Sequence, residues 1–214
     1  MSSHSTIDYY VWLMSDWAYL GGVRFVQMAV RHGLTINHIP MRMQDVYAGS
    51  GGILLAERSW QRQSYRIHEL KRWSSKLGIR VNIEPRFFPA DIDLASCLVI
   101  AAQKRGASVA DLVNGIMASI WADDADPADT NVLQRLAEKC GLKDAMQLLE
   151  EAQTETIRSE YRDNTQRALG AGVFGSPFYV YGGEIFWGQD RLDMLEEHII
   201  ESRGRDLGRR PPLA

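Results

Sequence analysis

Ser15 is the residue whose type and position point most directly to chemistry. It lies between residues 8–14, an apolar and β-branched stretch that predicts a strand, and a helical pattern that begins near Trp17. A serine at such a junction can cap the helix with its side-chain oxygen. A helix N-terminus also favours anions, and a hydroxyl there can donate a hydrogen bond to a bound thiolate, which lowers the pKa of the thiol. Both roles remain open for Ser15.

Charged and polar residues near helix starts limit the ligands that could bind. Asp16 suits the dipole of its helix but opposes a neighbouring thiolate. Gln189 and Asp190 open the last helix, where they can cap it or clamp the amino and carboxylate ends of a ligand. Arg62 and Arg66 lie one turn apart on a predicted helix, and either can be solvated or contact an anionic substrate.

Pro177 stands directly before a β-rich run, residues 178–181. A proline donates no hydrogen bond to a sheet, so its place at the head of a strand suggests another purpose. A cis Ser176–Pro177 bond would turn the neighbouring backbone N–H and C=O outward, free to bind something extended. Gly182-Gly183 predicts a two-residue hairpin turn, with residues 184–187 as the return strand. A plain surface hairpin is the alternative.

Residues 170–175 match the glycine pattern G-x-G-x-x-G of dinucleotide-binding loops. That pattern binds a nucleotide only where it follows a strand and opens a helix. Here a helical stretch precedes it and a strand follows, so we reject a nucleotide site.

Composition narrows the class of protein. The chain has 214 residues, 45% of them hydrophobic, which is enough for one large domain or a domain with an insertion. Its net charge of -3 predicts no nucleic acid partner, and no apolar run approaches the roughly 20 residues that span a bilayer. Cys97 and Cys140 form no C-x-x-C motif, and the histidines lack metal-ligand spacing. We therefore expect no metal site. No signal peptide is evident in residues 1–6, so we expect a cytoplasmic protein.

The chain in order predicts two short β-rich ends around a helical middle. The N-terminal part predicts a βαβ unit whose two strands should be parallel. It consists of a strand at 8–14, a helix from Trp17 to about His32 and a strand at 34–40. A glycine-rich loop at 49–52 follows. Helices are then predicted at 58–77, 93–104, 109–121, 131–139 and 144–169. In the first of them Trp60, Ile67, Leu70 and Trp73 should face inward, and Thr130 should cap the helix at 131–139. The final helix is predicted at about 189–201, with Leu192, Leu195 and Ile199 on one face.

The order βαβ, helices, ββα predicts an α/β fold of the thioredoxin-like type, with an all-helical domain inserted and a cis proline before the third strand. The thioredoxin-like domain would comprise residues 1–43 and 171–203. Residues 44–170 would form the helical insertion, and residues 204–214 a flexible tail.

The chain resembles a known family, the 2-hydroxychromene-2-carboxylate isomerases, which are relatives of the kappa-class glutathione transferases and of DsbA-like proteins. The matching pieces keep the family's order and are residues 8–20, 70–73 with 78–79, 173–177 and 187–192.

The resemblance implies a glutathione-dependent cis-trans isomerase in aromatic compound catabolism, acting on a small aromatic carboxylate as a homodimer. Ser15 would hold the glutathione sulfur, and the backbone of Ser176 beside cis-Pro177 would pair with the cysteinyl part. The γ-glutamyl end would be held by Trp187, Gly188, Gln189 and Asp190.

The sequence departs from the family at four places. Asp16 replaces a usual Pro, Ser176 a usual Val, Gly51 a usual Asn, and Arg62 stands nearest to a usual Lys. The last two departures lie on the substrate side, so the resemblance implies that Gly51 and Arg62 are the substrate-binding residues. Two alternatives remain open: a kappa-type transferase that releases a conjugate, and a non-catalytic DsbA-like binding protein. A thiol oxidoreductase is disfavoured because Ser15 occupies the position where a C-x-x-C motif would begin.

Overall fold

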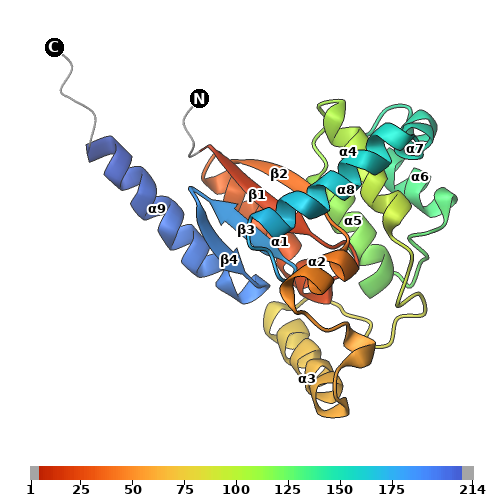
Figure 1. Ribbon diagram of the computed structural model, residues 1–214, viewed down its shortest axis with the longest axis horizontal. Coiled ribbons are helices and arrows are strands. Elements are labelled where there is room, and N and C mark those ends of the chain that lie inside the picture. Colours follow the sequence, from red (N-terminus) through yellow and green to blue (C-terminus); the bar gives the residue numbers. More distant parts are fainter. Residues whose placement is uncertain (1–4, 209–214) are drawn as a thin grey trace.

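The sheet is built around β1 (Thr6–Val11), which pairs with a neighbour on each side. It lies parallel to β2 (Thr35–Pro40), as predicted for the βαβ unit. On its other side β1 is antiparallel to β3 (Phe178–Tyr181), which pairs with β4 (Glu184–Trp187). The order β2-β1-β3-β4 therefore places a strand from the N-terminal part of the chain beside one from the C-terminal part at the centre of one sheet, as Figure 1 shows. The computed structural model describes residues 5–208.

The hairpin between β3 and β4 follows from its glycines. Gly182 and Gly183 have φ angles of 60° and 87°, which only glycine adopts without strain. Two successive positive φ angles give the turn a twist that matches the strands beside it. The predicted hairpin is confirmed.

The two faces of the sheet carry separate apolar clusters. Successive side chains of a strand point to opposite faces, so the buried Tyr9 and Tyr10 lie in different clusters. Tyr9 stacks on Tyr179 at 5.3 Å between ring centroids, and Phe25 of α1 (Asp16–Arg31) lies 4.8 Å from Tyr9. Helix α1 thus covers one face and links the paired strands.

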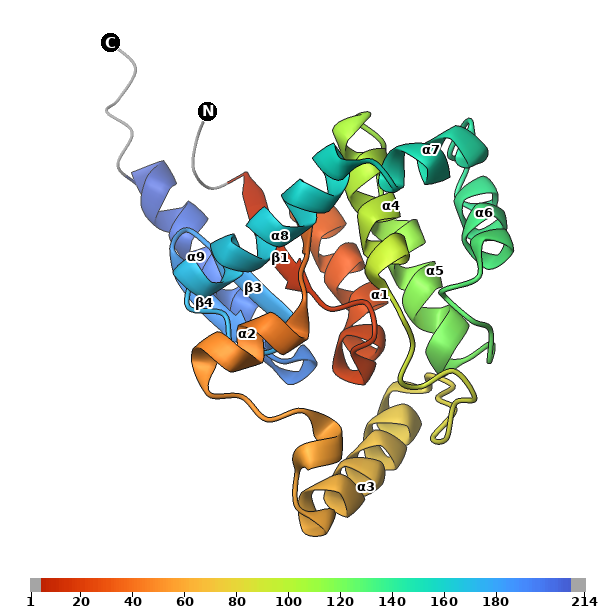
Figure 2. The same cartoon turned by 45° about the vertical axis from the view of Figure 1, so that its right-hand side comes forward.

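The helical middle of the chain packs beside the sheet and over its other face. Helices α2 and α8 cover the Tyr10 side, while α4 and α5 share the larger apolar cluster with α1 (Figures 1 and 2). The helices between β2 and β3 are α2 (Met43–Ser50), η1 (Leu55–Glu57), α3 (Trp60–Leu77), α4 (Asp93–Lys104), α5 (Ala110–Trp121), α6 (Thr130–Lys139), α7 (Ala145–Ala152) and α8 (Glu155–Gly170).

Helix α3 stands apart from the other helices, as Figure 2 shows. Only Leu70 of this helix is buried, and Trp60, predicted to face inward, is 73% exposed. The prediction for Trp60 is wrong: its apolar spacing is helical, yet the side chain is exposed to solvent. The helix reaches the rest of the molecule mainly at its middle and its end.

Several predicted boundaries are wrong. Strand β1 ends at Val11, since Trp12 enters a turn in which its carbonyl accepts the N–H of Ser15 at 2.9 Å. Gly49 and Ser50 belong to α2 rather than to a loop. The helix predicted at 144–169 is two helices, because Thr154 begins a new one.

The cap of α6 also differs from the prediction. Asp129, not Thr130, is the cap residue, and its carboxylate accepts the N–H of Asn131 at 2.8 Å. An aspartate and a threonine are both good caps, so the backbone of the preceding turn decides between them.

The last helix is longer than predicted. After the turn η2 (Gln189–Arg191), α9 runs over Leu192–Gly208 and so enters the segment 204–214 that the sequence predicts as a tail. Residues 1–4 and 209–214, which include parts of that tail and of the N-terminal segment, lie outside the described residues. Leu192, Leu195 and Ile199 are buried as predicted.

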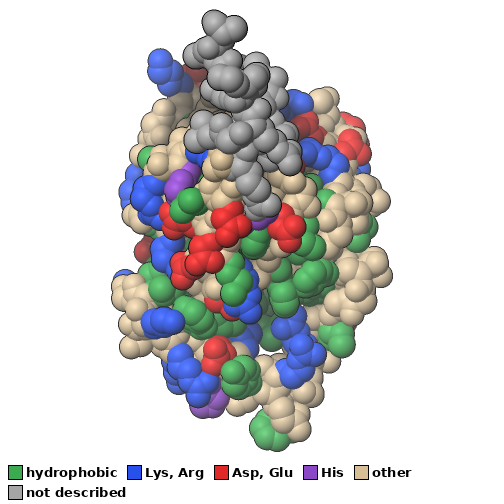
Figure 3. Space-filling view, turned by 90° about the vertical axis from the view of Figure 1, so that its left-hand side faces the viewer, with side chains coloured by type: hydrophobic (Ala, Val, Ile, Leu, Met, Phe, Trp, Pro, Cys, Tyr) green, Lys and Arg blue, Asp and Glu red, His purple; other side chains and the backbone are tan. Residues whose placement is uncertain are grey.

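The side of the molecule that carries α9 has a mixed surface. Figure 3 faces this side and shows acidic side chains gathered near its centre, among hydrophobic and basic ones. Within residues 5–208, no helix is long and apolar enough to cross a bilayer.

Candidate functional site

Ser15 joins the start of α1 to the loop before β3. Its Oγ accepts the N–H of Ala18 at 3.1 Å, which is the predicted helix cap. The same hydroxyl donates to the carbonyl of Ser176, also at 3.1 Å, and Ser15 is only 4% exposed. Capping therefore does not exclude a second role, because the hydroxyl bridges two segments distant in sequence.

Three hydrogen bonds hold the loop that carries Pro177, one of them the bond from Ser15 to the carbonyl of Ser176. The Ser176–Pro177 peptide bond is cis. Ser176 Oγ accepts the N–H of Trp12 at 2.9 Å, and the carbonyl of Pro177 accepts the N–H of Gly188 at 3.0 Å. No partner within residues 5–208 takes the N–H of Ser176, so this backbone group is available to an extended ligand.

Two cavities meet at this loop, and Trp17 and Ser176 line both of them. The smaller, of about 70 Å³, lies on the Ser15 side. It is lined by apolar and aromatic groups together with three charged side chains, Asp16, Arg58 and Arg66.

The larger cavity, of about 290 Å³, extends toward the start of the last helix. Its lining brings together four residues that the sequence assigned to one ligand end, with Glu69 and Trp73 of α3 opposite them: Trp187, Gly188, Gln189 and Asp190. Gly188 has a φ of 103°, and a Cβ there would lie 2.5 Å from Asp190 Oδ1, so only glycine fits.

Gln189 is 2% exposed and is bound to α1. The guanidinium of Arg24 donates to its backbone carbonyl at 3.1 Å and also to its side-chain oxygen. The carboxylate of Asp190 is more open and lies 3.1 Å from Arg191. Gln189 thus anchors the turn, while the Asp190 carboxylate, although paired with Arg191, is exposed enough for a ligand to reach it.

Asp16 and Arg66 form a buried ion pair on the wall of the smaller cavity. Arg66 Nη2 lies 2.6 Å from Asp16 Oδ2, and the two side chains are 12% and 8% exposed. The guanidinium also lies 5.4 Å from the ring centroids of both Phe88 and Trp121, within the range of cation–π attraction. Arg66 is therefore held on three sides.

Burial and the ion pair with Arg66 shift the pKa of Asp16 in opposite directions. Burial raises the pKa of its carboxyl, while the Arg66 charge and the N–H of Trp17, 2.8 Å from Oδ1, oppose that rise. Arg66 also neutralises the charge that would otherwise repel a thiolate at the start of α1. The structure thus removes the main electrostatic objection to Asp16 at this position.

Gly51 and Arg62, predicted to bind substrate, lie outside the linings of both cavities. Gly51 ends α2 with a φ of 77°, and Arg62 is exposed on α3. The cavity instead presents Arg66, one turn further along, and Arg58, which the sequence analysis did not select. A buried acid needs a cation, so Asp16 was the signal that could have favoured Arg66 over Arg62.

Arg58 is fixed by neutral partners. Its Nε donates to the carbonyl of Ile53 at 2.9 Å and its Nη2 to the hydroxyl of Tyr47 at 3.2 Å. Arg58 and Arg66 against Asp16 leave the cavity wall with two positive charges and one negative, a net charge of +1. Such a wall suits a small monoanion with an apolar body.

The chain is similar in sequence to known proteins. The family described as DSBA-like thioredoxin domain matches residues 6–200. A protein of Sphingobium xenophagum named 2-hydroxychromene-2-carboxylate isomerase is 31% identical, over 92% of this chain and 98% of its own length. A protein of the same name from Pseudomonas putida is 28% identical, over 89% of this chain and 92% of its own.

Solved structures are similar in fold. A selenomethionine form of a 2-hydroxychromene-2-carboxylate isomerase has a TM-score of 0.79 at 22% identity, over 96% of this chain and 100% of that one. The cytosolic disulfide reductase DsbM from Pseudomonas aeruginosa, solved with GSH, has a TM-score of 0.67 at 16% identity, over 94% and 99%. The predicted thioredoxin-like fold with inserted helices is confirmed.

Proposed function

This chain is an isomerase that belongs to the DsbA-like thioredoxin domain family and, within it, groups with the 2-hydroxychromene-2-carboxylate isomerases; from this premise we propose that it is a glutathione-dependent cis-trans isomerase of a small aromatic carboxylate. One observation carries the proposal. Ser15, at the N-terminus of α1, is hydrogen-bonded to Ser176 beside cis-Pro177, where the larger cavity meets the smaller one that Arg58 and Arg66 line.

Two groups at the larger cavity support the proposal that it binds glutathione. The free N–H of Ser176 can pair with the peptide backbone of its cysteinyl part, and the Asp190 carboxylate can accept from its terminal amine. The start of the last helix favours the neighbouring carboxylate of the same end. The sulfur would then lie at the junction of the two cavities, next to Ser15.

Bound there, glutathione would supply a thiolate nucleophile for reversible addition to a conjugated carbon, the chemistry that allows a double bond to rotate as a single bond. Ser15 and the dipole of α1 would stabilise the negative charge of that sulfur. Arg58 and Arg66 bind and orient the substrate carboxylate, while Phe88 and its apolar neighbours exclude water from the reacting atoms.

Other expectations from the resemblance stay predictions. They are a homodimer, a cytoplasmic location, a role in aromatic compound catabolism, and substrate contacts of Gly51 and Arg62.

The test is calorimetric titration with glutathione, followed by an ultraviolet assay with 2-hydroxychromene-2-carboxylate. We expect binding, and turnover that requires catalytic amounts of glutathione and does not consume it. Accumulation of a conjugate with a soluble electrophile, without turnover of the chromene acid, would instead identify a kappa-type transferase. Absence of glutathione binding would overturn the proposal and favour a non-catalytic binding protein.

A further inference from the structure

The hydroxyl proton of Ser15 already has an acceptor. A serine hydroxyl carries one proton, and in Ser15 that proton is donated to the carbonyl of Ser176. The oxygen meanwhile accepts the N–H of Ala18. To donate to a sulfur, Ser15 must first give up its bond to Ser176, which lowers the net gain from the new one.

The side chain of Ser176 is in the opposite situation. Its oxygen is held by the N–H of Trp12 at 2.9 Å, yet within residues 5–208 its own proton has no acceptor. Ser176 is 8% exposed, so little bulk water competes for that proton. Ser176 lines both cavities and thus lies at their junction.

We propose that the Ser176 hydroxyl is a second hydrogen-bond donor to the glutathione sulfur, beside Ser15. The inference rests on the proposed function and adds a residue to its site. Trp12 fixes the Ser176 oxygen, and Ser15 fixes the Ser176 backbone, so the donor is positioned before the ligand arrives. The two hydroxyls approach the sulfur from segments at opposite ends of the chain.

The expected effect is on the pKa of the bound thiol. A hydrogen bond to a charged group favours the ionised form, and its loss shifts a pKa by about one unit or more. Replacing Ser176 by Ala should therefore raise the pKa of bound glutathione by about one unit, and lower the thiolate fraction up to about tenfold when the pH is below that pKa.

The experiment is an ultraviolet titration of the thiolate of glutathione bound to the full chain. Ser176→Ala and Ser176→Val both remove the hydroxyl but leave different volumes, so one misfolded variant would not prevent the test. Ser176→Thr keeps the hydroxyl and should restore the low pKa. Ser119→Ala is the matched control, since Ser119 is buried in α5 and donates only to the carbonyl of Ile116.

The outcomes separate this inference from the proposed function. If the wild type binds glutathione and lowers its pKa, but Ser176→Ala and Ser176→Val leave that pKa unchanged, Ser176 is not a donor to the sulfur. If the wild type does not bind glutathione, the proposed function fails first. Loss of the bond from Trp12 alone would lower stability without shifting the bound thiol pKa, so the titration distinguishes the two roles.

Discussion

Helix α1 has a cluster of cationic and carboxylate groups at each end, and the two clusters differ mainly in burial. At the N-terminal end, Asp16 and Arg66 are 8% and 12% exposed and line a cavity. At the C-terminal end, Arg31 and Glu196 are 56% and 28% exposed. The same chemical groups therefore work in very different surroundings.

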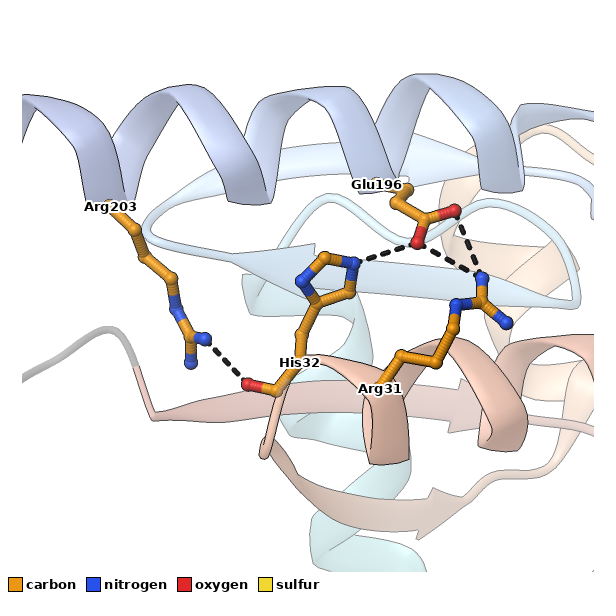
Figure 4. A network of polar contacts seen from close by, with 4 residues as sticks. All are labelled: Arg31, His32, Glu196 and Arg203. Carbon is orange, nitrogen blue, oxygen red and sulfur yellow. Dashed lines mark hydrogen bonds and ion pairs between the residues drawn. The ribbon is translucent and has the colours of Figure 1, made fainter.

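The C-terminal cluster joins α1 to α9, as Figure 4 shows. Glu196 accepts from Arg31 at 3.0 and 3.1 Å and lies 2.7 Å from His32 Nε2. Arg203, further along α9, donates to the carbonyl of His32 at 2.5 Å. Cations at a helix C-terminus suit the helix dipole, and the carbonyl that Arg203 binds is one that the helix leaves without a partner.

The difference in burial indicates which of the two ion pairs serves to stabilise the fold. Water screens an exposed pair, whose worth is about 0–1 kcal/mol, and several such contacts together hold α9 on α1. A buried pair must overcome the loss of hydration and seldom stabilises more than apolar groups of the same size would. The Asp16–Arg66 pair is better explained by its place beside Ser15 than by stability.

Arg66→Met should have the largest effect on stability. It leaves the Asp16 carboxylate buried without a partner, which should lower the free energy of unfolding by about 3–5 kcal/mol at neutral pH. Urea denaturation followed by circular dichroism measures it. The deficit should shrink in acid, since burial already raises the pKa of Asp16 and the carboxyl can then take a proton.

Arg31→Met is the matched control at the other end of α1, with an expected cost below about 1 kcal/mol. The double variant Asp16→Asn with Arg66→Met should recover most of the lost stability. Equal costs for the two Met variants would mean that burial does not distinguish the clusters.

Ser15→Ala should reduce turnover at least about tenfold, the scale of one hydrogen bond to a thiolate. It should also cost about 1 kcal/mol of stability through the lost helix cap. Steady-state kinetics and denaturation separate the two effects. Ser59→Ala is the control, because Ser59 precedes α3 without a side-chain cap bond, and unchanged turnover in Ser15→Ala would remove Ser15 from the mechanism.

As the pH rises, the contribution to stability should fall for Asp16 at the N-terminal end of α1 and rise for Glu196 at its C-terminal end. The pKa of Asp16 is raised in the folded state, so its contribution falls as the pH rises from the ordinary value of 3.8 to the raised one. Asp16→Asn should remove that fall. Denaturation midpoints measured across this range in wild type and variant test it, and identical profiles would contradict the assignment.

Glu196→Gln should have the smallest effect, below about 1 kcal/mol. Hydrogen bonding to His32, and to Arg31 with its charge, lowers the pKa of Glu196 below its ordinary value of 4.5. Its contribution is therefore complete above 4.5 and is lost as the pH falls through the lowered pKa, opposite to Asp16. The difference from wild type should also shrink in high salt; a cost that is insensitive to salt would contradict a screened pair.

Local patterns in the sequence predicted much of the fold. The bounds of α1 and α4, the Gly182-Gly183 hairpin and the buried face of α9 all follow from side-chain period and turn stereochemistry over a few residues. The order of these elements was enough to indicate the thioredoxin-like fold, and the resemblance supplied the proposed ligand.

Contacts between distant segments decided the rest. Arg62 and Arg66 are equivalent by helical spacing, yet only Arg66 meets Asp16, because the packing of α3 against α1 sets which turn faces the cavity. In the same way, Trp12 leaves the strand to donate to Ser176, more than a hundred residues later in the chain. Periodicity reports which face of an element is apolar, whereas the partner of a buried charge or hydroxyl depends on how those elements pack in three dimensions.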